Sequence, residues 1–580
     1  MERAQADIDA FTLPIANPTL SPRKYSSIIT SPTMNQSEKP EVILDDNAAA
    51  DDVTKDESYG LVKSRFDELS IPRTLWVFRR VVLVSLAVYT GYVCEGFELG
   101  AGGSVIANAG FIKQFGSDKS EGGVRALDPT WVSTWSALLN VGQIITLTHI
   151  AWVADKYGRK VSFYIAWLWL VIGCVLLNTA KTPAVWAIAK LCNGAGIGVL
   201  QITCQVYVME ISPNKIRGGL VTFQAVWSNI GGIIVSVMMQ QLNKKHPDNY
   251  LLAMRIIWAP VALMIVCWIF VPESPWFYAR HDNKEKAIKA LKQLYGGVEG
   301  FDFEEEYGII ARTIAHEKEV LQEAPSYRHV FKGLNLKRAF IVVVLTVSQQ
   351  FAGLAIINTY STYFFSLAGL NDPFLGTVIL SCCNLLAVLL WSLTTDKLGR
   401  RTIVNSCETL VCVVLFVVGG LFWTGATTGN TAAGTALLVI CCVWTFCYQV
   451  IVMSYYVFSA ELPSALLRGK FIPFKTGPIT FFFNSITGIA TCYATPPMLL
   501  HLSLKAGFVY GAFSVPICII MWLYVPETSG RSAAEIDELY ERKIPAWRWS
   551  KTVTEAEQRM QTVVLVKGGV KESHNQSHTQ

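Results

Sequence analysis

The sequence predicts an all-α integral membrane protein with twelve transmembrane helices. Hydrophobic residues make up 52% of the 580 residues and charged residues only 16%, whereas soluble proteins carry about 25% charged residues. Twelve apolar runs follow one another, each about as long as the roughly 20 residues that a helix needs to cross a bilayer. Strands of a membrane barrel would be about half that length and would alternate in polarity.

The apolar runs divide into two sets of six. The first set is placed at 81–106, 131–151, 161–180, 184–209, 219–241 and 251–271. The second set is placed at 339–368, 374–395, 402–424, 434–460, 472–495 and 506–525. We therefore expect a six-helix bundle over 81–271 and a second one over 339–525.

Three polar segments surround these bundles. Residues 1–80 are predicted to be a disordered tail, because they are poor in hydrophobic residues. Residues 526–580 form a second tail. Segment 272–338 is predicted to be a linker with surface helices, one of which is expected to be capped by Asp282 and to end at the glycines 296 and 297.

The basic residues predict the orientation in the membrane. Short loops on the side of the two termini carry an excess of Lys and Arg, which is typical of cytosolic loops. Both tails and the 272–338 linker are therefore expected in the cytosol, and the plasma membrane is the expected location.

Several function classes are not supported. The 14 cysteines include no CxxC pair, so a zinc or redox site is not indicated. The net charge of +5 does not indicate nucleic-acid binding. No nucleotide-binding loop or nucleophile elbow appears, so we expect neither an enzyme nor a cofactor. The bilayer is the expected environment, and the chain is expected to work as a monomer.

Three charged phrases occur in both halves, in the same order. DKYGRK begins at residue 155 and DKLGRR at 396; EISPNKIRG begins at 210 and ELPSALLRG at 461; VPESP begins at 271 and VPET at 525. The separations are similar, so the second six helices repeat the first six. Parallel six-helix repeats are an architecture of membrane transporters.

These phrases resemble the marks of the major facilitator superfamily, and of its sugar porter branch in particular. PESPW at 272–276 and PETSGR at 526–531 belong to the same pattern. A narrower similarity, to fungal maltose and α-glucoside permeases, is carried by HEKE at 316–319, SYRHVFKGLNLKR at 326–338 and TYSTYFFSLAGL at 359–370. The resemblance implies the major facilitator fold and transport by alternating access.

Charges at the helix ends are candidates for gating. They are expected to form ion pairs between helix ends when the inner gate is shut. The alternative is that they only set the topology, but the recurrence of acidic partners favours a latch. The candidates are Asp155, Arg159, Glu210 and Arg217 in the first half, and Asp396, Arg400, Glu461 and Arg468 in the second.

Amides within the apolar runs are candidates for binding a sugar, because an amide both donates and accepts hydrogen bonds. The alternative for any one of them is a hydrogen bond between helices. The resemblance implies a site that includes Gln224, Gln349, Gln350, Asn384, Tyr456 and Asn484. It also implies a central position for Gln350 but not for Gln201. Ala355 stands where many hexose porters have Asn.

Two carboxylates in the first span are candidates for proton coupling. Glu95 and Glu98 are three residues apart, which places them on one face of a helix. The permeases that the chain resembles have a similar pair. The chain departs from them at Gln143, where they have Glu, and at Thr480, where they have Arg. Lys190 is an unexpected cation in the fourth span that could neutralise one carboxylate.

The resulting functional prediction is a secondary active transporter that imports an oligosaccharide or α-glucoside together with protons. Two alternatives remain open at this point. One is an exporter of a fungal secondary metabolite with the same fold, which the departures at Gln143, Thr480 and Ala355 keep open. The other is a sugar sensor that does not transport.

Overall fold

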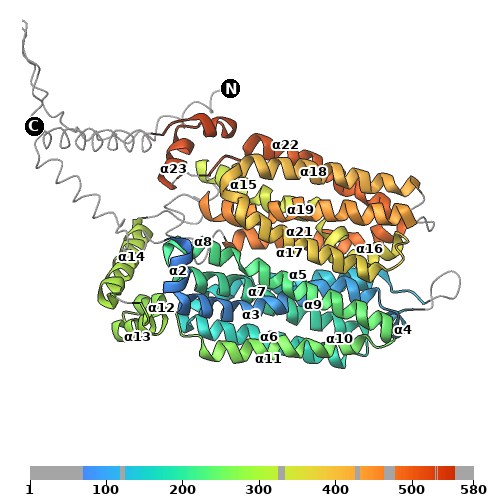
Figure 1. Ribbon diagram of the computed structural model, residues 1–580, viewed down its shortest axis with the longest axis horizontal. Coiled ribbons are helices and arrows are strands. Elements are labelled where there is room, and N and C mark those ends of the chain that lie inside the picture. The colour runs from blue at the N-terminus through green and yellow to red at the C-terminus, as the bar shows by residue number, and fades with distance from the viewer. Residues whose placement is uncertain are drawn as a thin grey trace, which may run out of the picture. The chain divides into compact units, whose positions relative to one another are not determined.

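The structure of the protein is a computed structural model (Figure 1). It describes residues 70–117, 125–298, 300–323, 333–424, 431–462, 477–529, 531 and 533–554. Within these ranges it leaves out the side chains of 214, 316–317, 319–323, 392–398, 431, 456, 459–460, 477–481 and 533–534. In these ranges the chain forms helices and connecting turns, apart from a bridge between Ser117 and Ala126.

The first half is coloured blue to green in Figure 1. It contains six membrane-crossing units. Its helices are α2 (Ile71–Val77), α3 (Arg79–Ile106), α4 (Ala109–Phe115), α5 (Pro129–Tyr157), α6 (Arg159–Thr179), α7 (Pro183–Ile211), α8 (Asn214–Thr222), α9 (Gln224–Lys245), α10 (Tyr250–Ile256) and α11 (Trp258–Phe270). Helices α8 and α9 together form the fifth unit, and α10 and α11 the sixth.

The second half repeats this plan. Its helices are α15 (Gly333–Gln349), η3 (Gln350–Thr359), α16 (Ser361–Leu367), α17 (Pro373–Leu398), α18 (Arg400–Gly420), η4 (Leu421–Thr424), α19 (Thr431–Glu461), α21 (Gly477–Leu502), η6 (Ser503–Lys505) and α22 (Ala506–Tyr524). The segment η3 is a π-helix that is broken at Gly353, whose φ of 92° is left-handed.

Eleven segments of the described chain are long and apolar enough to cross a membrane. The last of them, Phe482–Tyr524, contains both α21 and α22. The predicted all-α membrane protein with twelve crossing helices is therefore confirmed. The helical region begins earlier than the predicted end of the tail at residue 80, because α2 covers Ile71–Val77 and α3 starts at Arg79.

Three crossing helices begin with the same local signal, a capping side chain followed by proline. Asp128 accepts a hydrogen bond from the Thr130 amide at 2.9 Å, and Asp372 accepts one from the Leu375 amide at 3.0 Å. Thr182 caps α7 in the same way. The proline that follows each cap has no N–H to leave unpaired and a φ angle suited to the first helical turn.

The linker between the halves carries α12 (Pro275–Arg280), α13 (Lys284–Tyr295) and α14 (Phe303–Glu323). The expected cap of α13 was wrong by one residue: Asn283 accepts from the Lys286 amide at 3.1 Å. Asp282 instead has a left-handed φ of 55° in the preceding turn. After α22, the chain forms α23 (Ala533–Glu541) and the 3-10 turn η7 (Ala546–Lys551).

The two halves contact each other most extensively through α5 with α21 and α9 with α17. We call the end of the bundle that carries Gly158 and Gly399 the motif end, and the end that carries Tyr360 the tyrosine end. Polar contacts between the halves gather toward the tyrosine end: Ser104–Thr362 (3.1 Å), Ser136–Tyr360 (2.7 Å), Ser133–Tyr493 carbonyl (2.8 Å), Ser236–Ser381 (3.0 Å) and Lys244–Asp372 (3.4 Å). The tyrosine end is therefore closed in this structure.

Candidate functional site

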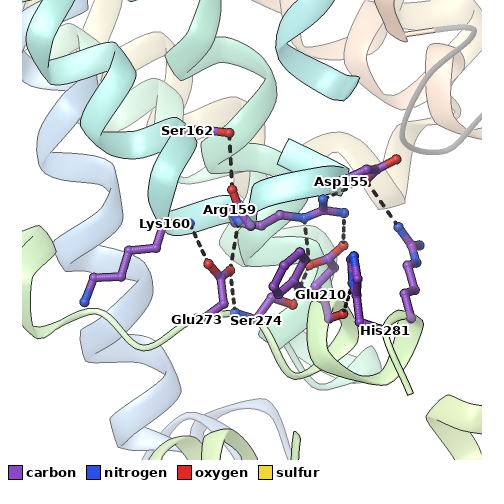
Figure 2. Close-up of polar contacts among 11 residues, drawn as sticks. Asp155, Arg159, Lys160, Ser162, Glu210, Glu273, Ser274 and His281 are labelled. Carbon is purple, nitrogen blue, oxygen red and sulfur yellow. Dashed lines mark hydrogen bonds and ion pairs between the residues drawn. The ribbon is translucent and has the colours of Figure 1, made fainter. Parts of the chain in front are cut away.

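At the motif end of the first half, Arg159 is the centre of a charged cluster (Figure 2). Its side chain is 2% exposed, and its guanidinium pairs with Asp155 at 2.7 Å and with Glu210 at 2.8 Å. Glu210 also accepts a hydrogen bond from the Ser274 hydroxyl. The cluster thus joins α5, α6 and α7 to the turn that follows α11.

Glu273, which the sequence analysis did not single out as a residue, completes this cluster. Its carboxylate accepts hydrogen bonds from the backbone amides of Arg159 and Lys160, each at 2.9 Å. These N–H groups lie in the first turn of α6 and have no acceptor within the helix, and a negative charge is favoured at this end of a helix. Gly158, with a φ of 106°, makes the turn into α6, and a Cβ there would lie 2.4 Å from the Glu273 carboxylate. Burial raises the pKa of the Glu273 carboxyl, and the backbone hydrogen bonds oppose that shift.

The second half contains the same arrangement. Arg400 forms an ion pair with Glu461. Glu527 accepts hydrogen bonds from the amides of Arg400 and Arg401 at 3.0 and 3.1 Å, beside Gly399 with its φ of 79°. The shared phrase VPE therefore supplies an acid that caps the start of the third and ninth crossing helices.

The remaining latch candidates are placed differently or lie outside the description. Arg217 donates to the Ser212 carbonyl from Nε (3.3 Å) and Nη2 (3.2 Å). Glu210 forms an ion pair with Arg159. The side chain of Asp396 and the whole of Arg468 lie outside the described residues. Each described latch pair lies within one half.

Two cavities lie at the centre of the bundle, between the halves. The first cavity, of about 260 Å³, is lined by Glu95, Gln201, Gln224, Gln349, Asn358, Asn384, Tyr448 and Gln449, among others. The second cavity, of about 170 Å³, is lined by Glu98, Asn140, Gln143, Lys190, Gln201, Gln350 and Asn484, among others. All five predicted amides therefore lie at the centre, three in the first cavity and two in the second.

The amides differ in whether the protein already satisfies them. The Oε1 atom of Gln224 and the Nε2 atom of Gln349 are buried and have no partner among the described residues. Asn384 is paired with Gln449. In the second cavity, Gln350 donates to Asn484 at 2.8 Å. Gln224 and Gln349 therefore have hydrogen-bonding atoms left for a ligand.

Gln201 connects the two cavities. It lines both, and it donates from Nε2 to the Glu95 carboxylate at 2.7 Å. Gln350 lines the second cavity, as the resemblance implied, but Gln201 is central as well, and its exclusion from the centre was wrong. The fourth span offered no short motif that marked Gln201; only the packing of α7 against α3 and α5 shows its position.

The two carboxylates of the first span face different cavities. Glu95 lines the first cavity and Glu98 the second, because three residues still leave side chains about 60° apart around a helix. Glu98 is 1% exposed and pairs with Lys190 at 2.7 Å. Lys190 therefore pairs with one of the two carboxylates, as the sequence suggested, and that carboxylate is Glu98.

An aromatic side chain also reaches the first cavity. Tyr448 lines it and stacks on Trp444, with ring centroids 4.5 Å apart and planes 9° apart. The residue expected to supply this aromatic group was Tyr456, whose side chain lies outside the described part of the chain. Tyr448 is eight residues earlier on the same helix, α19, and only the helix facing distinguishes it.

Two repeated six-helix halves, closed at one end around central polar cavities, define a membrane transporter. The model of the sugar (and other) transporter family matches residues 83–540, and the chain belongs to that family. The sugar porter branch predicted from the motifs is therefore confirmed, and the chain is a transporter rather than an enzyme.

Similar proteins include fungal transporters. The chain is 27% identical over 495 residues to the MFS transporter fmqE of Aspergillus fumigatus, covering 81% of this chain and 88% of that protein. It is 26% identical over 536 residues to the general alpha-glucoside permease of Saccharomyces cerevisiae, covering 89% of this chain and 83% of that one. Among solved structures, the xylose transporter XylE from E. coli matches with a TM-score of 0.64 at 18% identity, over 78% of this chain and 100% of that chain.

Proposed function

We propose that this transporter imports an α-glucoside or related oligosaccharide together with protons, across the plasma membrane, with both termini in the cytosol. The observation that carries the proposal is the first cavity with its unsatisfied amides, next to the buried Glu98–Lys190 ion pair of the second. The similarity to an alpha-glucoside permease supports the substrate class.

The first cavity suits an uncharged polyol. Gln224 and Gln349 supply an acceptor and a donor that have no other described partner, and a sugar hydroxyl can engage both kinds of atom. Leaving buried polar atoms unpaired costs about 1–3 kcal/mol each, so a ligand that satisfies them gains that energy. Tyr448 offers an aromatic surface for the apolar face of a sugar ring.

The amides come from both halves, which links binding to conformation. Gln224 is at the start of α9 in the first half, whereas Gln349 and Asn384 belong to α15 and α17 in the second. A sugar that contacts both sides brings the halves together around itself. Differential contacts of this kind are what allow a ligand to shift a two-state equilibrium.

The Glu98–Lys190 pair is our candidate for proton coupling, with Glu95 as the second acid. Both side chains of the pair are buried, with Lys190 5% exposed. Protonation of Glu98 would leave Lys190 without its counter-charge, and removing one partner of a buried pair is costly. Binding of a proton to Glu98 would therefore rearrange the side chains of the second cavity. Gln201 lines both cavities and is hydrogen-bonded to Glu95, so its movement would also alter the first cavity.

The test is uptake of radiolabelled maltose by cells that lack their own transporters, with and without a protonophore. We expect accumulation that the protonophore abolishes. Glu98→Gln should lose accumulation but keep exchange of maltose across the membrane. Glu305→Gln, which removes an exposed carboxylate in the linker, is the matched control. Uptake that is indifferent to the protonophore would refute the coupling, and an absence of uptake would refute the substrate class.

A second candidate is export of a fungal metabolite. It is favoured by the similarity to the MFS transporter fmqE and by Gln143, which contacts Ser485 (3.4 Å) in place of an acid. A tag inserted near Glu305 tests the orientation that both candidates share: it should be protected from external protease in intact cells. Inside-out vesicles that accumulate no maltose, while intact cells do, would exclude export of this sugar.

A further inference from the structure

Helix α18 carries a fully buried carboxylate that the transport mechanism above does not use. Glu408 is 0% exposed, and neither of its oxygens has a hydrogen-bond partner among the described residues. Asn405, one turn earlier, is also 0% exposed with both amide atoms unpartnered. Ionisable residues inside membrane spans are rare and are usually functional.

Glu408 differs from the two acids of the first span. Glu95 accepts a hydrogen bond from Gln201, and Glu98 pairs with Lys190. The separation of the repeated phrases DKYGRK and DKLGRR places Trp167 of α6 at the equivalent position of the first half. The acid is therefore not inherited from the repeat and belongs to the second half alone.

Among the residues that the structure describes, no cation compensates Glu408. The titratable groups within its electrostatic range are Tyr448 on α19, Cys518 on α22, and Cys407 and Cys412 on α18 itself. Among the described residues, Glu408 forms neither a hydrogen bond nor an ion pair through its carboxylate. An isolated carboxylate in an apolar environment binds a proton rather than keep its charge.

The packing along α18 connects the Glu408 face with the π-helix η3. Leu415 lies two turns further along the same buried face of α18, and its side chain lies against Gly353. Gly353 is the point at which η3 is broken, and π-helical segments often mark functional sites. Tyr448, the neighbour on α19, lines the first cavity. A shift of η3 would therefore change the packing over the face that now seals Glu408.

We propose that Glu408 is a proton-binding site of the second half, occupied while the tyrosine end is closed and emptied when that end opens. The proton adds to one carboxylate oxygen, comes from water on the side to which the transporter is open, and returns to water on the other side. No other bond changes. Glu408 would give the second half a proton site of its own, distinct from the Glu98–Lys190 pair.

The experiment is infrared spectroscopy of the purified full-length protein in lipid nanodiscs, without added sugar. The carbonyl stretch of a protonated carboxyl is separate from the bands of a carboxylate. At neutral pH we expect a protonated-carboxyl band that Glu408→Gln lacks and that the control Glu305→Gln retains. Should Glu408→Gln fail to fold, Glu408→Asp assigns the band instead, by moving it.

A second variant holds the tyrosine end open. A Cβ at Gly103 would lie 2.2 Å from the Thr359 carbonyl, so Gly103→Trp cannot reach the closed state. In that background we expect the Glu408-dependent band to fall at least twofold. A band that is absent in the wild type, or equally strong in both backgrounds, overturns the proposal. Neither outcome bears on maltose uptake, so the proposed function is judged separately.

Discussion

The two halves are alike at the motif end and different at the membrane centre. At the motif end, Arg159 and Arg400 each pair with an acid of the following span, and Glu273 and Glu527 each cap a helix start. At the centre both halves contribute amides, but the first half adds the Glu98–Lys190 pair, whereas the second adds Tyr448 and Glu408, which has no partner among the described residues. The repeat has kept the parts that hold each bundle together, and the halves have diverged where ligands and protons would bind.

The largest loss of stability is expected at the buried Glu98–Lys190 pair, which only the first half contains. Lys190→Met leaves Glu98 as an uncompensated buried charge, which costs about 3–5 kcal/mol. The double variant Glu98→Gln with Lys190→Met should recover most of that loss. Thermal unfolding in detergent measures both. If the double variant is as unstable as the single one, the interaction of Lys190 with Glu98 is not what stabilises this site.

The similarity of the two halves at the motif end can be tested by comparing the stability lost when each arginine is removed. Arg159→Ala removes the partner of two acids from a site where the arginine side chain is only 2% exposed, so we expect a loss near 3 kcal/mol. The equivalent pair of the second half, Arg400 with Glu461, is 16% and 30% exposed, so Arg400→Ala should cost about 1 kcal/mol. The readouts are melting temperature and transport rate. Lys318→Ala, at an exposed position of the linker, is the control. Equal losses of stability for Arg159→Ala and Arg400→Ala would contradict the expected difference between the buried and the more exposed ion pair.

A third prediction concerns the closed tyrosine end, where the halves meet. A Cβ at Gly103 would overlap the Thr359 carbonyl, whereas one at the neighbouring Gly102 meets nothing within 4 Å. Overpacking of this kind costs about 1–3 kcal/mol, so Gly103→Ala should shift the population away from the closed state. Gly102→Ala should not. Cysteines at Ser133 and Tyr493 would report closure by their cross-linking yield, and equal yields in both variants would contradict the close packing.

The smallest expected effect is a pH dependence at Glu273. Burial raises the pKa of this carboxyl in the folded protein. The folded state therefore binds more protons than the unfolded state, starting near the ordinary Glu pKa of about 4.3. Stability then falls as the pH rises through this window. Between pH 5 and 7 the melting temperature of the wild type should fall slightly more than that of Glu273→Gln. If the melting temperatures of the wild type and of Glu273→Gln change equally with pH, Glu273 does not contribute to the pH dependence of stability.

Much of this architecture could be predicted from the sequence. The twelve apolar runs indicated the crossing helices, because span length is set by the thickness of the hydrocarbon layer. The repeated phrases indicated the two halves. They also predicted that Asp155, Arg159 and Glu210 lie close together, because short loops hold charged residues at the ends of neighbouring helices. The sugar porter family followed from the same phrases.

The site was predicted less completely, because the sequence does not show which way a buried helix faces. Gln201 and Tyr448 carried no motif, although both line the first cavity. Glu95 and Glu98 were expected on one face, but the angle of about 60° between side chains three residues apart places them in separate cavities. Glu408 was missed because one acid in an apolar run has no meaning until its neighbours are known.

The sequence by itself therefore determined the membrane class, the number of crossing helices, the repeat and the family, since all of these depend on local composition and on short motifs. Only the tertiary structure decided which polar groups are satisfied and which are left over. Lys190 is 92 residues from Glu98, and a partner for Glu408 would have to come from another element packed against α18. Whether a buried charge is neutralised depends on contacts between distant helices, because in hydrocarbon there is no water to take the place of a missing partner.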